Sequence, residues 1–139
     1  MTVPTNTSKT LNIILWISQI LIAILLLSGT FIKFMPIEKV AAMMPWTGEV
    51  PVWAVRLLGV IDLLGAIGLI LPAALGIKRK LVAVTALCIV LLMISAIVFH
   101  VARNEASSIG INIFTASVAA FIAWGRSSKA SIRSKQSTF

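Results

Sequence analysis

The chain has 139 residues, of which 59% are hydrophobic and only 12% are charged, and its formal net charge is +8. This composition excludes a soluble globular domain and is typical of an integral membrane protein. A membrane-spanning helix needs about 20 apolar residues, so this length has room for about four spans and for no separate soluble domain.

Long apolar runs follow one another along the chain, at residues 11–32, 52–75, 81–101 and 108–124. Backbone N–H and C=O groups in lipid must be satisfied within the segment, so each run is predicted to be a helix. The links after the second and third runs are short, which favours antiparallel neighbours. The expected fold is an all-α membrane protein, an antiparallel four-transmembrane-helix bundle, with residues 11–126 as its membrane domain.

The two ends of the chain are polar. Residues 1–10 precede an apolar run that is longer than the hydrophobic region of a signal peptide, so we expect a cytoplasmic N-terminal segment and a retained first span. Residues 127–139 are polar and basic, and they are expected to form a disordered cytoplasmic tail.

Basic residues gather at both ends of the chain and in the link "GIKRK". Short basic segments beside membrane spans stay on the cytoplasmic side, which predicts a cell-membrane protein with both termini in the cytoplasm. These charges are split among short flanking segments without interleaved aromatic residues. Topology and anionic lipid therefore explain them better than nucleic-acid binding does.

The link between the first two runs, "KFMPIEKVAAMMPWTGEVP", is the one sizeable loop and is predicted to lie on the outer face. Pro36 can begin a short helix there and Pro45 can end it. Helical spacing would place apolar side chains on one side: Ile37, Val40, Ala41 and Met44. We expect an amphipathic helix at the interface, with Trp46 and Trp53 as belt residues. It is either a packed cap or a lid over a site in the outer half of the bundle.

Opposite charges interrupt the second run, "VRLLGVIDLLGAIGLILP", at Arg56 and Asp62. At about 1.5 Å per residue, Arg56 is expected about 6 Å and Asp62 about 15 Å below the outer surface. A charge at that depth is costly unless it is paired or hydrated, so Asp62 is predicted to face the bundle interior. An axial separation of about 9 Å argues against a direct Arg56–Asp62 salt bridge. Asp62 either finds a partner on another helix or is protonated.

Other polar residues of the runs are candidate partners. His100 and Asn112 lie toward the outer face. Gln19 lies near the midplane, and Lys33 closes the first run at the outer surface. The inner half of the bundle is expected to be almost purely apolar. We predict a pocket that opens outward, with Asp62 and His100 as candidate catalytic residues. The candidate ligand-binding residues are Arg56, Gln19, Asn112 and Lys33.

Each of these residues also has a purely structural interpretation. His100 is a candidate helix cap, and Arg56 is a candidate for a side chain that extends to the lipid headgroups. Gln19 and Asn112 are candidates for hydrogen bonds between helices, and Lys33 for an interfacial anchor. With one cysteine and one histidine in the chain, no metal site is predicted.

Four stretches, in this order and spacing, carry a family resemblance: "LLLSGTFIKF", "RLLGVIDLLGAIGLILP", "LLMISAIVFHVARNE" and "AAFIAWGR". From about residue 11 to residue 126 the chain resembles the DoxX-like family of small integral membrane proteins. Recurring family positions that it matches are Lys33, Arg56, Asp62, Pro72 and His100, although Glu is commoner than Asp at position 62. The resemblance implies a four-helix membrane bundle. Members are linked to thiosulfate:quinone oxidoreductase or to oxidative-stress complexes, and relatives of similar fold act as membrane chaperones.

Two functions are compatible with these expectations. One is a redox-associated accessory subunit, or small oxidoreductase, that binds a quinone-like ring in the outer half. Arg56 and His100 would hydrogen-bond the carbonyl oxygens of the ring, and Asp62 would relay protons. The other is a non-catalytic assembly factor or chaperone that holds a partner membrane protein. A quinone is the one cofactor candidate, and the expected partners are membrane lipid and a redox or other membrane protein. A transporter is less favoured, because neither inverted repeats nor broken helices are apparent.

Overall fold

Helices make up nearly all of the computed structural model, which describes residues 6–77 and 80–129. In chain order the elements are α1 (Asn6–Lys33), α2 (Ile37–Met43), η1 (Pro45–Glu49), α3 (Val52–Leu75), α4 (Lys80–Ala102), η2 (Ala106–Ser108), α5 (Gly110–Trp124) and η3 (Gly125–Lys129). No strand occurs in these described ranges. Within them, four segments are long and apolar enough to cross a membrane: Lys9–Lys33, Val52–Leu75, Lys80–Ala102 and Ala106–Ser127. The predicted all-α, four-span architecture is confirmed.

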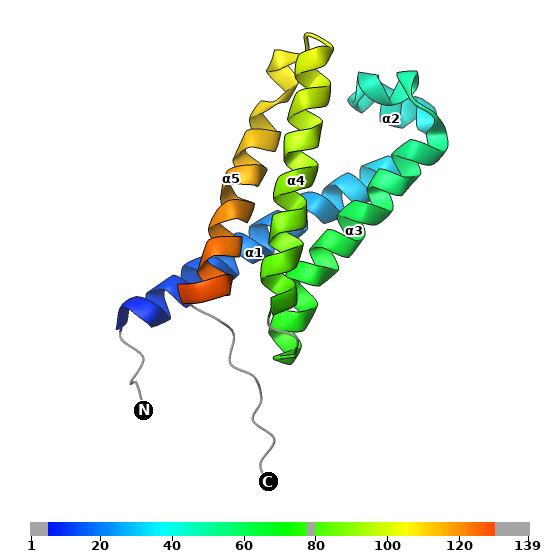
Figure 1. The fold of residues 1–139 in the computed structure, drawn as a ribbon. Helices are drawn as coiled ribbons and strands as arrows, with labels where there is room; N and C mark the ends of the chain where they lie inside the picture. The colour runs from blue at the N-terminus through cyan, green and yellow to red at the C-terminus, as the bar shows by residue number, and fades with distance from the viewer. Residues whose placement is uncertain (1–5, 78–79, 130–139) are drawn as a thin grey trace.

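The long helices α1, α3, α4 and α5 form a bundle around an apolar core. α1 packs on α3, α3 on α4, α4 on α5, and α5 on α1. Figure 1 shows that α1 begins and α5 ends at the same end of the bundle, which we call the terminus end. Aliphatic side chains from all four helices fill the centre, among them Ile22, Leu69, Val82 and Ile122. Short links between consecutive helices explain this up-and-down order.

Elements α2 and η1, residues 37–49, form a small cap at the opposite end, which we call the cap end (Figure 1). α2 begins after Pro36, as predicted. Its apolar side faces inward, because Val40 is fully buried while Glu38 and Lys39 are exposed. The amphipathic helix expected in this loop is therefore confirmed.

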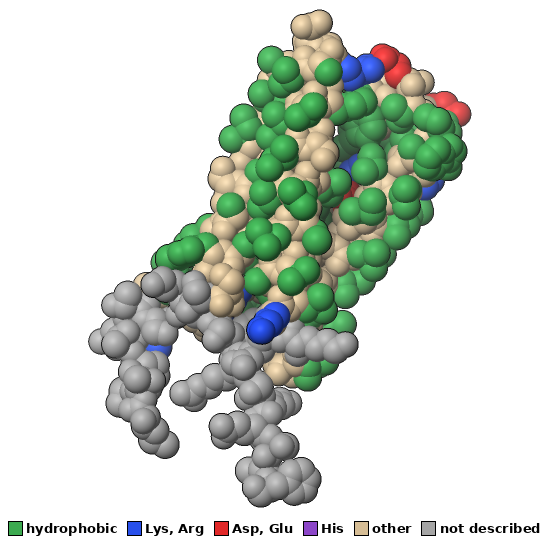
Figure 2. Space-filling model, viewed as in Figure 1, with side chains coloured by type: hydrophobic (Ala, Val, Ile, Leu, Met, Phe, Trp, Pro, Cys, Tyr) green, Lys and Arg blue, Asp and Glu red, His purple; other side chains and the backbone are tan. Residues whose placement is uncertain are grey.

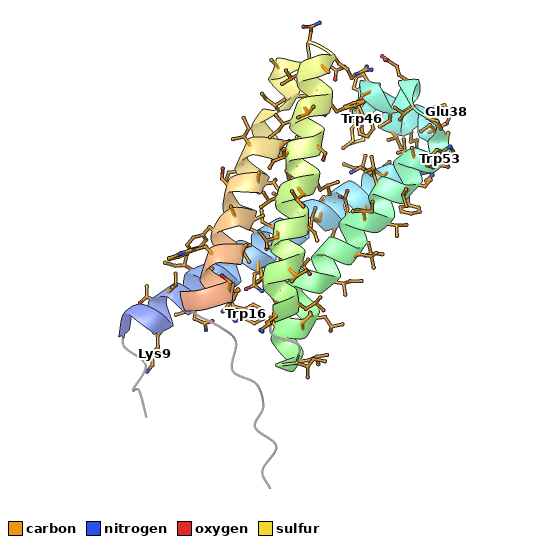
Figure 3. The ribbon with its side chains drawn as sticks, viewed as in Figure 1. Lys9, Trp16, Glu38, Trp46 and Trp53 are labelled. Carbon is orange, nitrogen blue, oxygen red and sulfur yellow. The ribbon has the colours of Figure 1, made fainter. Side chains whose placement is uncertain are left out.

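The two expected belt tryptophans, Trp46 in η1 and Trp53 at the start of α3, differ in their surroundings. Trp53 is 69% exposed, as a belt residue would be. Trp46, by contrast, packs edge-to-face against Phe99 of α4, with ring centroids 5.8 Å apart. Figure 3 shows Trp46 between the cap and the end of α4. Trp46 is thus partly buried against α4, and its position at the membrane interface stays a prediction.

The first and last spans extend beyond their expected boundaries. α1 begins at Asn6 instead of residue 11. At the other end, η3 continues the helix to Lys129, so residues 127–129 are helical and are not part of a disordered tail. Hydrophobicity patterns stop at the first charges, whereas backbone hydrogen bonding continues past them. The rest of the expected tail, residues 130–139, lies outside the described residues, as do residues 1–5, Lys78 and Arg79.

Apolar side chains cover the long outer sides of the bundle. Phe31 is 72% exposed and Leu91 is 65% exposed, which suits contact with lipid tails and not with water. Figure 2 shows hydrophobic side chains along the bundle, acidic side chains at the cap end and basic side chains at both ends. Which side of the membrane each end faces stays a prediction from the basic residues.

Candidate functional site

A buried ion pair between α1 and α3 is the centre of the candidate site. Lys33 Nζ lies 2.6 Å from Asp62 Oδ2, and the two side chains are only 13% and 7% exposed. Lys33 is the last residue of α1, and Asp62 lies near the middle of α3. Asp62 is buried, as predicted, and of the two alternatives expected for it the structure shows a partner on another helix. The interpretation of Lys33 as an interfacial anchor is wrong, because its long side chain runs back along α1 into the bundle.

Gly29, one helical turn before Lys33, leaves the space for this pair. A Cβ atom at position 29 would lie 2.9 Å from Asp62 Oδ2 and 3.2 Å from Lys33 Nζ. Residues four apart share one face of a helix, so the missing side chain is directly below the lysine. The ion pair therefore depends on a glycine at this position.

Replacing Gly29 with alanine is expected to destabilise the bundle by about 1–3 kcal/mol, because the new methyl group overpacks the ion pair. Thermal unfolding in detergent measures the change. Gly110→Ala is the matched control, since a Cβ atom there meets nothing within 4 Å. An equal melting temperature for the two variants would show that the ion pair tolerates a side chain at position 29.

Arg56 lies beside the pair but binds the backbone of α1. Its Nη1 donates to the carbonyl of Lys33 and, at 2.9 Å, to the carbonyl of Met35. Its guanidinium also lies over the Phe34 ring, 5.7 Å from the centroid. The last carbonyls of a helix have no partner within the helix, and a cation there is favourable. Arg56 thus caps α1 and fixes the turn that leads into α2. Asp62 pairs with Lys33, whereas Arg56 binds these carbonyls, and ligand binding by Arg56 stays a prediction.

His100 belongs to a second polar group, at the end of α4. Its Nδ1 lies 2.8 Å from Glu105 Oε2, and its ring packs edge-to-face on Phe99. Arg103 Nε donates to Glu105 Oε1 at 3.1 Å, and Arg103 Nη2 donates to Glu49 Oε2 of the cap at 2.6 Å. This group therefore connects the α4–α5 link with the cap.

Glu105 is the acid on which this second group converges. The hydrogen bond from His100, and then the one from Arg103, hold the pKa of the Glu105 carboxyl below its ordinary value of 4.5. Glu105 is therefore charged at neutral pH. Its paired charge contributes stability above pH 4.5, and that contribution is lost as the pH falls through the lowered pKa.

A third polar group, of which Gln19 and Arg126 are buried, lies toward the terminus end, where the bundle was expected to be almost purely apolar. The fully buried Gln19 donates from Nε2 to the Leu69 carbonyl at 2.6 Å. Arg126 donates from Nε to Gln19 Oε1 and from Nη1 to Asn12 Oδ1, both at 2.6 Å. The Arg126 guanidinium also lies over the ring of Trp16, which Figure 3 shows at this end of the bundle. The expectation of an apolar inner half is wrong, because η3 carries Arg126 back between the helices.

The structure thus places the predicted site residues in separate groups. Lys33 and Asp62 are brought together, with Arg56 beside them, whereas Gln19 belongs to the terminus end. Asn112 donates to the Ser108 carbonyl one turn before it, at 3.4 Å. Sequence reasoning missed Arg126. The signal for it was the spacing of Asn12 and Gln19, which are seven residues apart and share one face of α1.

Comparison with protein families matches residues 17–122 to the model of the DoxX-like family. No curated protein matches the chain, and no solved structure matches it. The matched range begins in α1, ends in α5 and includes the Lys33–Asp62 pair and His100. Since the match covers most of the 139 residues, this multi-pass membrane protein belongs to the DoxX-like family.

Proposed function

We propose that the protein is a redox-associated membrane subunit that binds a quinone-like ring at the cap end, beside Lys33 and Asp62. The observation that supports this proposal is the burial of two opposite charges, 2.6 Å apart, between apolar helices. Charged side chains within membrane spans are costly, and where they persist they usually belong to a functional site.

Lys33 is the group best suited to bind an oxygen of the ring. An ammonium group has several N–H donors, and Asp62 accepts from one of them, so another can donate to a ring carbonyl. Lys33 takes the role that we expected for Arg56, whose Nη1 is bound to backbone carbonyls. The pairing with Asp62 keeps the ammonium in place before a ligand arrives.

The proposed chemistry is quinone reduction, which consumes a pair of electrons and a pair of protons. A partner redox protein would supply the electrons. Asp62 would pass protons to the ring oxygens, while Lys33 stabilises the negative charge that develops on them. His100, hydrogen-bonded to Glu105 in the separate group at the cap end, would take up protons from water there.

The alternative function, an assembly factor or chaperone for a membrane protein, draws on another surface. An open groove of about 580 Å³ runs along α1, and its lining is almost wholly apolar. By helical spacing it faces away from Lys33. Its lining residues are Ile24, Leu27, Ser28, Phe31, Ile32, Met35 and Met43. Methionine side chains adapt to varied partners, so a transmembrane helix of another protein is the occupant that this alternative predicts.

Native mass spectrometry of the detergent-extracted protein separates the two functions, because a quinone and a protein differ in mass. We expect a quinone adduct on the native chain. A protein adduct without quinone would favour the alternative. The absence of both adducts, together with no binding of an added short-chain quinone, would contradict the proposed function.

Binding of a short-chain quinone, followed by tryptophan fluorescence, tests the residues. A hydrogen bond to a charged group contributes about 1.5–3 kcal/mol, so Lys33→Met is expected to weaken binding about tenfold to a hundredfold. The double variant Lys33→Met with Asp62→Leu keeps the site free of unpaired charge and is expected to lose binding to a similar degree. Lys39→Met removes an exposed lysine of the cap and is the matched control.

A further inference from the structure

The cap is connected to α4 by an exposed ion pair and an aromatic contact. Glu49 of η1 bonds Arg103 at 2.6 Å, and Arg103 also bonds Glu105 at 3.1 Å. We call these residues, Glu49, Arg103 and Glu105, the clasp. Beside it, the Trp46 ring lies 5.8 Å from the Phe99 ring. In the described part of the chain, α2 packs mainly on η1 and the end of α1, without an extensive interface with α4.

The clasp is a weak and reversible kind of connection. The Glu49 side chain is 62% exposed, and exposed ion pairs contribute little stability and are screened by salt. Trp46 and Phe99 add a contact that is local to one edge of the cap. These contacts lie outside the apolar core of the bundle, which is formed by the four long helices.

The buried ion pair lies next to this cap. Only residues 34–36 separate Lys33 from α2, and Arg56 fixes their backbone through the Lys33 and Met35 carbonyls. Figure 2 shows the surface hollowed beside the outer part of α4, below the cap, with basic and acidic side chains visible in its depth. The cap meets the end of α4 beside this hollow, through the Glu49–Arg103 ion pair and the Trp46–Phe99 contact.

We propose that the cap is a lid over the Lys33–Asp62 pair and that the Glu49–Arg103 ion pair holds it closed. This proposal rests on the proposed function for its purpose, since it gives a ligand access to that site. The lid opens when the ion pair is screened or removed. An anionic surface that competes for Arg103, such as a partner's acidic loop, would open it in the same way.

Amine reactivity tests the lid without any quinone. Lys9 and Lys33 lie near opposite ends of α1, and Lys9 is exposed whereas Lys33 is mostly buried. In detergent, mass spectrometry after brief acetylation gives the ratio of modified Lys33 to modified Lys9. Glu49→Gln is expected to raise this ratio about twofold to fivefold, which is the effect of losing an exposed ion pair on the opening equilibrium.

The control variant is Glu38→Gln, which removes an exposed acid of the same cap that lies outside the clasp. About 1 M salt, at which the screening length is about 3 Å, should raise the ratio in the native chain and change it little in Glu49→Gln. An unchanged ratio in Glu49→Gln, or an equal rise in Glu38→Gln, would overturn the lid. A positive lid result without quinone binding would leave the lid standing and refute only the proposed ligand.

Discussion

Replacing Asp62 with asparagine is expected to destabilise the protein by about 3–5 kcal/mol, because Lys33 is then buried without its counter-charge. The pair is the most enclosed ion pair among the described residues, with side chains 13% and 7% exposed. Equilibrium unfolding in mixed detergent, followed by circular dichroism, measures the loss. Substitution of both partners, Lys33→Met with Asp62→Leu, is expected to restore most of the stability, since no charge remains unpaired.

Glu38→Gln provides the comparison for Asp62→Asn, because it removes an exposed carboxylate from the cap. Exposed substitutions of this kind usually change stability by less than about 0.5 kcal/mol. If Asp62→Asn is no more destabilising than Glu38→Gln, the Lys33–Asp62 pair does not stabilise the bundle. If the double variant is as unstable as the single one, packing and not charge explains the loss.

Arg126→Met is expected to lower the free energy of unfolding by about 3 kcal/mol. Hydrogen bonds to charged groups contribute about 1.5–3 kcal/mol each, and Arg126 makes two such bonds, to Gln19 and Asn12. Without Arg126, the amide oxygen of Gln19 loses this donor while Gln19 remains in a fully buried position. The same unfolding measurement in detergent gives the magnitude.

Lys9→Met is the control for Arg126→Met, because it removes an exposed basic residue from the same end of the bundle. Gln19→Leu combined with Arg126→Met should cost less than the sum of the two single changes, since both break the same hydrogen bond. Equal stability of Lys9→Met and Arg126→Met would mean that the buried arginine is not a structural contact.

The spans were predictable from the sequence because lipid sets their length and chemistry. The second apolar run and α3 have the same limits, residues 52–75, since Pro51 precedes the helix and Gly76, with φ 65°, ends it. The short helix of the cap was predictable for a similar reason, because Pro36 and the spacing of apolar residues mark it locally. Prolines, a glycine and the spacing of apolar residues, together with the lipid environment, thus specify these elements.

The partners within the candidate site were predictable only in part. Depth along a helix follows from residue count, so Asp62 was identified as a buried charge in need of a partner. The identity of that partner depends on which helix faces face each other and on how far a lysine side chain reaches. Lys33 was assigned to the surface because its Cα ends α1, although Gly29 one turn earlier allows the side chain to run inward.

Arg126 escaped prediction for a related reason. Basic residues that follow a span are ordinarily assigned to the cytoplasmic side. This assignment does not consider that the helix can continue past the span and carry an arginine back into the bundle. Gly125 lets the end of α5 approach α1, since a Cβ atom there would lie 2.6 Å from Leu15 Cδ2. A glycine next to an arginine, opposite two amides on one helix face, is the pattern that would have indicated the contact.

The contact between Gln19 and Arg126 has a consequence for the order of membrane insertion during synthesis. Lys33 and Asp62 are 29 residues apart, so they can pair as soon as α3 joins α1 in the bilayer. Gln19 and Arg126 are 107 residues apart, so the Gln19 amide oxygen can accept this hydrogen bond only after the last span has left the ribosome. The contact at the terminus end is therefore expected to form last, and a chain truncated before Arg126 would leave the Gln19 amide oxygen without this hydrogen bond inside the membrane.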